Sequence, residues 1–192
     1  MTAEIESTAR RDVVSDDSEA LILVDGEDRA IGSLDKARCH DGNGTLHRAF
    51  SVFIFNAAGE LLLQQRASDK RLWPNFWSNS CCSHPRQGET MEIATVRRCQ
   101  EELGITTQLQ FIYKFEYQAN FEDLGAEHEL CSVYVGQFEG TTDINSAEVQ
   151  AIRWVNAHQL DTELATQPEM YTPWFHMEWR ALRTQFADHL PI

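Results

Sequence analysis

The chain has 192 residues, enough for one compact domain, and carries a formal net charge of −14 at pH 7. This acidic balance excludes the basic surface with which proteins displace counterions from nucleic-acid phosphates. Five cysteines, an odd number, favour reduced thiols in a cytoplasmic protein, and no apolar run is long enough to cross a membrane. We therefore expect a soluble protein with a small-molecule ligand and neither a nucleic-acid nor a membrane partner.

The first part of the chain predicts an acidic tail followed by a hairpin. Residues 1–18 contain few large apolar side chains and are predicted to be disordered, which leaves residues 19–192 as a single domain. Residues 21–24 and 30–32 flank a polar turn and predict two antiparallel strands. Residues 36–47 predict a loop that carries two histidines.

Strand patterns dominate the middle of the chain. Residues 50–55 and 61–66 are rich in β-branched and aromatic residues around a short turn, and they predict a hairpin of buried strands. Residues 111–117 and 127–135 alternate with the period of two that is typical of strands. A further strand is predicted over residues 151–155, before a short polar segment.

A central helix is predicted between Thr90, a possible N-cap, and Gly104, a possible C-terminal cap. Apolar residues recur at helical spacing and predict an amphipathic helix: Ile93, Val96, Cys99 or Gln100, and Leu103.

A terminal helix is predicted after Thr172, with Pro173 at its first position and an apolar stripe that leaves Trp174 to one side. The stripe consists of Phe175, Trp179, Leu182 and Phe186. Mixed strands with one central and one terminal helix predict an α+β fold rather than a regular parallel βαβ array.

Histidine and carboxylate side chains suggest a metal site. The candidates are His40, His47, His84, Glu127 and Glu129. Each histidine alone is better explained as a structural residue, and the glutamate pair alone as a solvated strand face. In combination they favour a metal, because two carboxylates on one strand face beside apolar residues are costly without a cation. Mixed nitrogen and oxygen ligands favour Mn²⁺, Mg²⁺ or Zn²⁺.

The segment around Cys82 and His84 carries reactive groups on one side if it is extended, because side chains alternate across a strand. A thiol beside a metal-linked carboxylate offers one acid and one base for proton transfer at carbon. Behind this segment, Arg98 and Glu102 emerge from the central helix and suit a phosphate and Mg²⁺, whereas Arg97 and its partner Glu101 suit ordinary surface pairing.

The segment from Ser83 to Ile105 is similar to the signature of the Nudix superfamily, G-x5-E-x7-R-E-U-x-E-E-x-G-U. The matching positions are Glu89, Arg97, Glu101, Glu102, Gly104 and Ile105. Ser83 replaces the first glycine, and Arg98 replaces a glutamate that belongs to the metal cluster of the superfamily's hydrolases. The resemblance with this departure implies phosphate binding without cleavage.

A longer resemblance covers the chain from about Glu19 to the C-terminus. The elements that carry it are Lys36-x3-His40-x6-His47, Arg66-x3-Lys70, Trp73-Pro74, Asn79-Ser80-Cys81-Cys82-Ser83-His84-Pro85, Arg98-x3-Glu102-x-Gly104, Tyr117, Glu127-x-Glu129 and Pro173-Trp174. In their order and spacing they resemble the type I isopentenyl diphosphate isomerase family. The implied fold is a Nudix-like α/β/α sandwich with a mixed sheet, an extra N-terminal hairpin and a C-terminal helix.

The resemblance implies an isomerase that interconverts isopentenyl diphosphate and dimethylallyl diphosphate. A divalent metal, Mn²⁺ or Zn²⁺, would be bound by His40, His47, His84, Glu127 and Glu129. Mg²⁺ shared with the substrate would be bound by Glu102 and the backbone carbonyl of Cys82. The substrate diphosphate would contact Lys36, Arg66, Lys70 and Arg98.

The resemblance also implies that Cys82 and Glu129 transfer the protons and that Tyr117 hydrogen-bonds Glu129. Between the two proton transfers, the ring of Trp174 would stabilise a tertiary carbocation. An aromatic face in a dry site suits this role, because it stabilises a cation without attacking it.

Two other functions stay open from the sequence. A Nudix pyrophosphohydrolase would use the same helix and metal, and a non-catalytic Nudix-like module would only bind a diphosphate. We expect the chain to be a monomer or a weak homodimer.

Overall fold

The centre of the structure is β3 (His47–Phe55), whose side chains alternate between two apolar layers. In the computed structural model, which describes residues 13–192, Phe53 and Phe55 pack on one face of the sheet. Val52 and Ile54 pack on the other face. Because β3 is buried on both faces, its sequence is an almost continuous apolar run.

The sheet has nine strands and is mixed, with β3 at its crossing point. Along its length β3 pairs in parallel with β8 (Gly125–Gln137). It also pairs antiparallel with β1 (Ala20–Val24), β4 (Leu61–Arg66) and β6 (Cys81–Ser83). The parallel pairing sets which residues of β3 and β8 lie side by side at the functional site.

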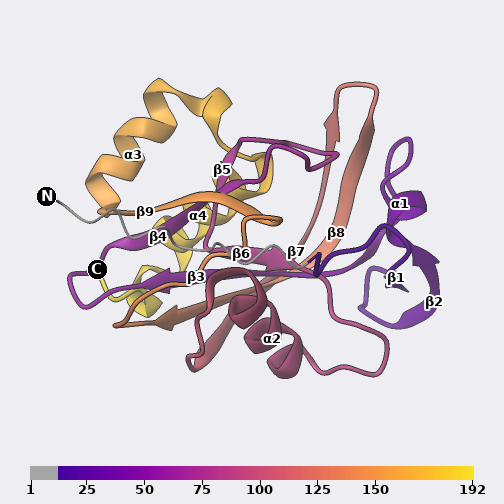
Figure 1. Ribbon diagram of the computed structural model, residues 1–192, viewed down its shortest axis with the longest axis horizontal. Helices are drawn as coiled ribbons and strands as arrows, with labels where there is room; N and C mark the ends of the chain where they lie inside the picture. The colour runs from indigo at the N-terminus through magenta and orange to yellow at the C-terminus, as the bar shows by residue number, and fades with distance from the viewer. Residues whose placement is uncertain (1–12) are drawn as a thin grey trace, which may run out of the picture.

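The remaining strands pair with β1, β4 and β8. They are β2 (Ala30–Asp35) beside β1, β5 (Trp77–Ser78) and β9 (Val149–Val155) beside β4, and β7 (Leu109–Phe121) beside β8. The long β7–β8 hairpin projects beyond the other strands, and β1 and β2 lie near it at one end of the molecule (Figure 1). This N-terminal hairpin agrees with the prediction.

Helices cover both faces of the sheet (Figure 1). On one face lies α2 (Met91–Leu103), and on the other lie α3 (Ala157–Thr166) and α4 (Pro173–Gln185). Short helical turns are α1 (Lys36–Cys39), η1 (Pro168–Met170) and η2 (Ala187–His189). The predicted α/β/α sandwich with a mixed sheet is therefore confirmed.

The predicted hairpin forms, but its pairing and two predicted loops differ in detail from the prediction. The strands 50–55 and 61–66 pair with each other only next to their turn, at Phe55 and Leu61, because each then takes other partners in the sheet. The predicted loop of residues 36–47 begins with α1, and the polar segment after β9 forms α3, whose N-cap Asn156 accepts a hydrogen bond from the backbone of Gln159.

The caps of α2 agree with the prediction, but its buried face agrees only in part, at Cys99 and Leu103. Thr90 accepts a hydrogen bond from the backbone N–H of Ile93, and Gly104 ends the helix in the left-handed conformation. Ile93 itself is 59% exposed, whereas Arg98 and Glu102 are buried at 2% and 3%. The apolar spacing failed here because one buried edge of the helix faces charged partners rather than the core.

The start of α4 also differs from the prediction. Thr172 precedes Pro173 as expected, but its hydroxyl lies 2.8 Å from the Ser78 hydroxyl and does not cap the helix. Trp174 was expected beside the core face, yet it is only 2% exposed and packs edge-on against Trp73 at 5.1 Å.

Two further observations concern the whole described chain. No helix within residues 13–192 is both long and apolar enough to cross a bilayer. The five cysteines all carry free thiols, as predicted from their odd number. Of the predicted disordered tail of residues 1–18, the first twelve residues lie outside the described part.

We expect Gly104→Ala to lower the free energy of unfolding by about 2–4 kcal/mol. Gly104 has φ +67, and an added Cβ would lie 2.8 Å from the Cβ of Asp143. Gly88→Ala is the matched control, since Gly88 has φ +81 but nothing within 4 Å of an added Cβ, so it reports backbone strain alone, about 1 kcal/mol. Urea denaturation followed by circular dichroism would compare the two; equal losses would contradict the steric explanation.

Candidate active site

Five predicted metal ligands come together where several strands begin or end. His47 opens β3, and its register partner on β8 is Glu129. Glu127 lies on the same face of β8, His40 follows α1, and His84 follows β6. All five residues are buried, with exposed fractions of 8% or less.

The ligand atoms converge on one point. The Nε2 atoms of His47 and His84 are 3.1 Å apart, and His84 Nε2 is 3.1 Å from an oxygen of Glu129. His40 Nε2 lies 2.7 Å from Glu127 Oε2, although neither atom has a hydrogen bond of good geometry with any described residue. One atom from each histidine and one from Glu127 lie within 4.8 Å of one another.

These residues fit a divalent cation. Nδ1 of His40 lies 2.7 Å from the carbonyl of Lys36, and Nδ1 of His47 lies 2.7 Å from the carbonyl of Thr45. A carbonyl can only accept, so each Nδ1 carries the proton and each Nε2 directs a lone pair into the cluster. Lone pairs and carboxylates that face one another in a buried space repel unless a cation lies between them.

The pKa values of the cluster reflect burial opposed by pairing. Burial lowers the pKa of His84 to about 4, although Glu129 opposes the shift. For Glu129, burial alone would raise the pKa, but the neighbouring imidazoles of His47 and His84 outweigh burial and hold it well below the usual value. Without a metal, the cluster therefore keeps Glu129 ionised beside a neutral His84.

A close backbone contact fixes the position of His40. Gly125, at the start of β8, has φ +149, and a Cβ added there would lie 2.2 Å from the carbonyl oxygen of His40. The same carbonyl accepts a hydrogen bond of 3.0 Å from the N–H of Ala126. The hairpin β7–β8 therefore holds the backbone of His40 directly, at a point where no side chain fits.

Beside the metal cluster, Cys82 lines a cavity with Trp174 and Glu129. Cys82 pairs with Ser51 in the β3–β6 register, so it faces the α4 side, whereas Cys81 packs toward α2. Burial raises the pKa of Cys82 to about 12, so its thiol keeps its proton at neutral pH.

Tyr117 and Trp174 complete this wall. The Tyr117 hydroxyl donates a 2.7 Å hydrogen bond to Glu129 Oε2, and the two residues are register partners of β7 and β8. Trp174 donates a 3.0 Å hydrogen bond from Nε1 to Ser78 Oγ. The Arg66 guanidinium lies 5.3 Å from the centre of the Trp174 ring.

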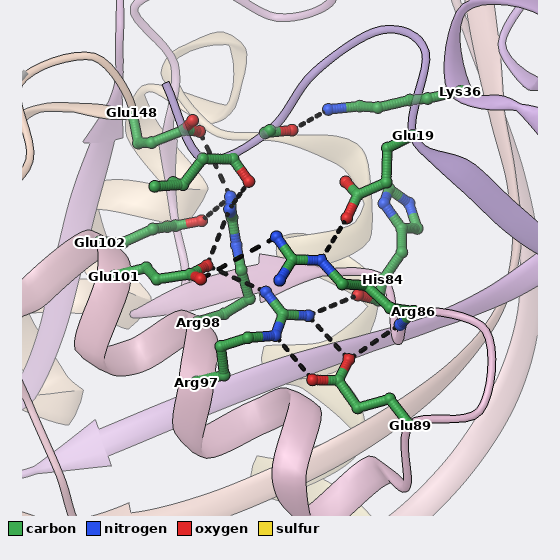
Figure 2. Close-up of polar contacts among 12 residues, drawn as sticks. Glu19, Lys36, His84, Arg86, Glu89, Arg97, Arg98, Glu101, Glu102 and Glu148 are labelled. Atoms are coloured by element: carbon green, nitrogen blue, oxygen red, sulfur yellow. Dashed lines mark hydrogen bonds and ion pairs between the residues drawn. The ribbon is translucent and has the colours of Figure 1, made fainter. Parts of the chain in front are cut away.

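The four cationic residues predicted to bind a phosphate lie around two adjoining cavities, the larger of about 360 Å³. These residues are Lys36, Arg66, Lys70 and Arg98. Lys36 donates to the hydroxyl of Ser15, and Arg98 donates a 2.7 Å hydrogen bond to the carbonyl of Val14 (Figure 2). Residues from the end of the acidic tail thus contact two of the predicted phosphate ligands.

Figure 2 shows the two arginines of α2 with their partners. Arg98 NH2 points to Glu102 at 2.5 Å and to Glu148 at 3.3 Å. Arg97 instead pairs with Glu89 at 2.7 Å and with Glu101 at 2.9 Å, and Glu101 also lies 3.4 Å from Arg98 NH1. As expected, Arg97 and Glu101 form a structural pair, while Arg98 and Glu102 face the site.

Two buried glutamates were missed in the sequence. Glu148 lies just before β9 in a polar stretch, with no pattern to single it out. Glu178 is four residues after Trp174 on the buried face of α4, so a charged residue within the apolar stripe was the available signal. One oxygen of Glu178 lies 3.6 Å from Cys131 Sγ, and the other has no partner among the described residues. Burial raises the pKa of Glu178 to about 8.

Comparison with known proteins identifies the family. A model described as the NUDIX domain matches residues 45–175. Isopentenyl-diphosphate Delta-isomerase 1 of Photorhabdus laumondii is 41% identical over 174 residues, which span 90% of this chain and 99% of the relative. This chain belongs to the isopentenyl-diphosphate Delta-isomerase family.

Other family members support the assignment. Isopentenyl-diphosphate Delta-isomerase of Serratia proteamaculans is 47% identical over 82% of this chain and 87% of its own length. The enzyme of that name from Burkholderia multivorans is 46% identical over 82% of this chain and 89% of its own length. The predicted family and its isomerase activity are therefore confirmed, and the hydrolase and sensor alternatives are not favoured.

Solved structures agree on the fold. DR0079 from Deinococcus radiodurans superposes with a TM-score of 0.70 over 84% of this chain and 98% of its own chain, at 22% sequence identity. A MutT protein from Methanosarcina mazei gives a TM-score of 0.57 over 70% of this chain and 89% of its own, at 18% identity. At these identities the likeness shows that this chain shares their fold, and it shows nothing about chemistry.

We expect His47→Gln to weaken binding of Mn²⁺ or Zn²⁺ at least about a hundredfold, because it removes a buried ligand nitrogen. The matched control is His128→Gln, since His128 lies between Glu127 and Glu129 on the opposite strand face and pairs with Glu116 at 3.0 Å. Metal analysis after dialysis, followed by calorimetric titration of the stripped protein, would measure both. Equal affinity in the two variants would contradict the proposed ligand set.

We expect Glu178→Gln to flatten the pH dependence of stability. The Glu178 carboxyl has a pKa of about 8 in the folded protein and near 4.5 in the unfolded chain. Its contribution to the free energy of unfolding therefore falls as pH rises between these values. Between pH 5 and pH 8, the difference in free energy of unfolding between variant and wild type should shift by about 2 kcal/mol or more in favour of the variant. Urea titrations at the two pH values would test this. A pH-independent difference between variant and wild type would show that Glu178 is ionised throughout.

Proposed function

We propose that Cys82 and Glu129 are the acid and the base with which this isomerase interconverts isopentenyl diphosphate and dimethylallyl diphosphate. The observation that carries the proposal is that the thiol and the carboxylate line one cavity together with Trp174. A double bond moves along a carbon chain when a proton is added at one carbon and removed from another, which needs one acid and one base in reach of the substrate.

The protonation states of the two groups support these roles. The raised pKa of Cys82, about 12, keeps the thiol protonated, so that it can give a proton to the alkene. The lowered pKa of Glu129 keeps its carboxylate ready to accept one. Tyr117 holds the second oxygen of Glu129 by its 2.7 Å hydrogen bond and so orients the base.

His40, His47, His84, Glu127 and Glu129 would hold one divalent metal, Mn²⁺ or Zn²⁺. When bound, the metal supplies positive charge that offsets the repulsion within this buried cluster. Glu102 and the carbonyl of Cys82 would hold Mg²⁺ together with the substrate diphosphate. Lys36, Arg66, Lys70 and Arg98 would bind the diphosphate oxygens, which suits their places around the two cavities.

Trp174 would stabilise the tertiary carbocation between the two proton transfers. Its ring is buried at 2% and packed edge-on against Trp73, so it is held in one orientation and helps to exclude water. The Ser78 hydroxyl accepts the indole N–H, which helps to hold the ring in place.

The same proposal treats residues 19–192 as one isomerase domain of a cytoplasmic protein that is a monomer or a weak homodimer. Hydrolysis is disfavoured by Arg98, which fills the position of a hydrolase glutamate with a buried cation bound to Glu102. The arrangement favours binding the diphosphate intact.

The wild type incubated with isopentenyl diphosphate and Mg²⁺ in heavy water should form dimethylallyl diphosphate that carries deuterium, without releasing phosphate. Cys82→Ala and Glu129→Gln should each lose at least about a thousandfold in kcat, since each removes a proton-transfer group. The matched control is Cys81→Ala, a thiol on the same strand that faces α2. Mass spectrometry and a phosphate assay would follow both products.

Phosphate release without deuterium in the product would contradict the isomerase reaction. Full turnover of Cys82→Ala or Glu129→Gln would contradict the assignment of that residue, while leaving the activity itself intact. Strong chelators should abolish turnover, and full activity of a metal-free sample would contradict the need for a metal.

A further inference from the structure

Glu148 places a buried negative charge inside the group of cations proposed to bind the substrate diphosphate. Its side chain is 3% exposed, and it lines both cavities together with Lys36, Arg66 and Lys70. A carboxylate in this position repels an incoming diphosphate, so attraction of the anion does not explain why Glu148 is there.

The backbone around Glu148 fixes where its carboxylate can point. The Glu148 carbonyl accepts a 3.1 Å hydrogen bond from the N–H of Ala67, which ties it to the loop that follows Arg66. Nearby, the N–H of Asn145 donates to the carbonyl of Glu102 at 2.8 Å. The segment before β9 is therefore attached both to the loop that carries Lys70 and to the end of α2.

The carboxylate of Glu148 contacts two of the cations directly. Its Oε2 atom accepts from Lys70 Nζ and lies 3.3 Å from Arg98 NH2. Burial would raise the pKa of Glu148, but Lys70 and Arg98 outweigh burial and lower it, so the group is ionised. One fixed carboxylate thus limits the directions that two long, flexible cationic side chains can take.

The carboxylate also changes the charge of the site. Four cationic side chains surround the cavities, and Glu102 and Glu148 oppose them from within hydrogen-bond distance of Arg98. A site with fewer carboxylates would favour the bare diphosphate, which is highly anionic. The carboxylates of Glu102 and Glu148 lower the positive charge around Arg98 and so favour a diphosphate that arrives with a divalent cation.

We propose that Glu148 is a positioning and specificity-determining residue: it holds Lys70 and Arg98 in place, and its charge makes the site select diphosphate accompanied by Mg²⁺ over bare diphosphate. The inference rests on the proposed function, which places the diphosphate at these cations. It goes beyond that proposal because Glu148 acts through its neighbours and its charge and takes no part in proton transfer.

The test measures binding rather than turnover. Inorganic pyrophosphate is titrated calorimetrically into wild type and variants, with Mg²⁺ and with the ion removed, at fixed content of the other metal. Wild type should bind more weakly without Mg²⁺. In Glu148→Gln the ratio of pyrophosphate affinities with and without Mg²⁺ should fall at least about tenfold, because removal of one buried negative charge strengthens binding of the bare anion.

Two variants separate charge from structure. Glu148→Asp keeps the charge on a shorter side chain and should keep the Mg²⁺ dependence while binding pyrophosphate more weakly, because the carboxylate no longer reaches both cations. The matched control is Glu163→Gln, which removes a carboxylate paired with Arg153 outside both cavities and should leave the Mg²⁺ dependence unchanged.

The outcomes distinguish this inference from the proposed function. If Glu148→Gln keeps the Mg²⁺ dependence of wild type within about twofold, or Glu148→Asp loses it as Glu148→Gln does, the role of Glu148 is overturned while the isomerase proposal stands. If wild type binds no pyrophosphate under either condition, the placement of the diphosphate itself fails. Should Glu148→Gln not fold, the titrations of Glu148→Asp, of Lys70→Gln and of the variant with both substitutions still decide. Loss of Lys70 should weaken pyrophosphate binding less in Glu148→Asp than in wild type.

Discussion

The parallel pairing of β3 with β8 is the constraint on which the site depends. Its register puts His47 beside Glu129, and the antiparallel pairing of β7 with β8 puts Tyr117 on the other side of the same carboxylate. Since side chains alternate along a strand, a slip of one residue would turn Glu129 away and bring His128 to the ligand face. Backbone hydrogen bonds of the sheet therefore fix the relative positions of His47, Tyr117 and Glu129.

Buried carboxylates in this acidic chain are stabilised in three different ways. Glu129 is held by histidines and a tyrosine, Glu148 by Lys70 and Arg98, and Glu178 by its own proton. All three are buried to a similar degree, so burial alone does not decide their charge. Their different partners keep two of these carboxyls ionised and one neutral within a single small domain.

Much of this arrangement could be predicted from the sequence where a local pattern carries the information. The spacing of Glu127 and Glu129 on a strand, and the caps at Thr90 and Gly104, depend only on neighbours in the chain. Glu148 could not be found in this way, because its partners come from distant segments. The same holds for the buried face of α2 and for α3, whose burial depends on the sheet that they cover.

The residue with the strictest size limit at this site has no side chain at all. Gly125 lets the β7–β8 hairpin touch the backbone of His40, and an added Cβ would overlap the carbonyl oxygen that Ala126 binds. In a survey of substitutions across the whole chain, this position should therefore resemble a metal ligand in its intolerance, although it binds nothing. Such sensitivity alone would suggest a catalytic role for Gly125, whereas the geometry of the hairpin explains it by steric overlap with the His40 backbone.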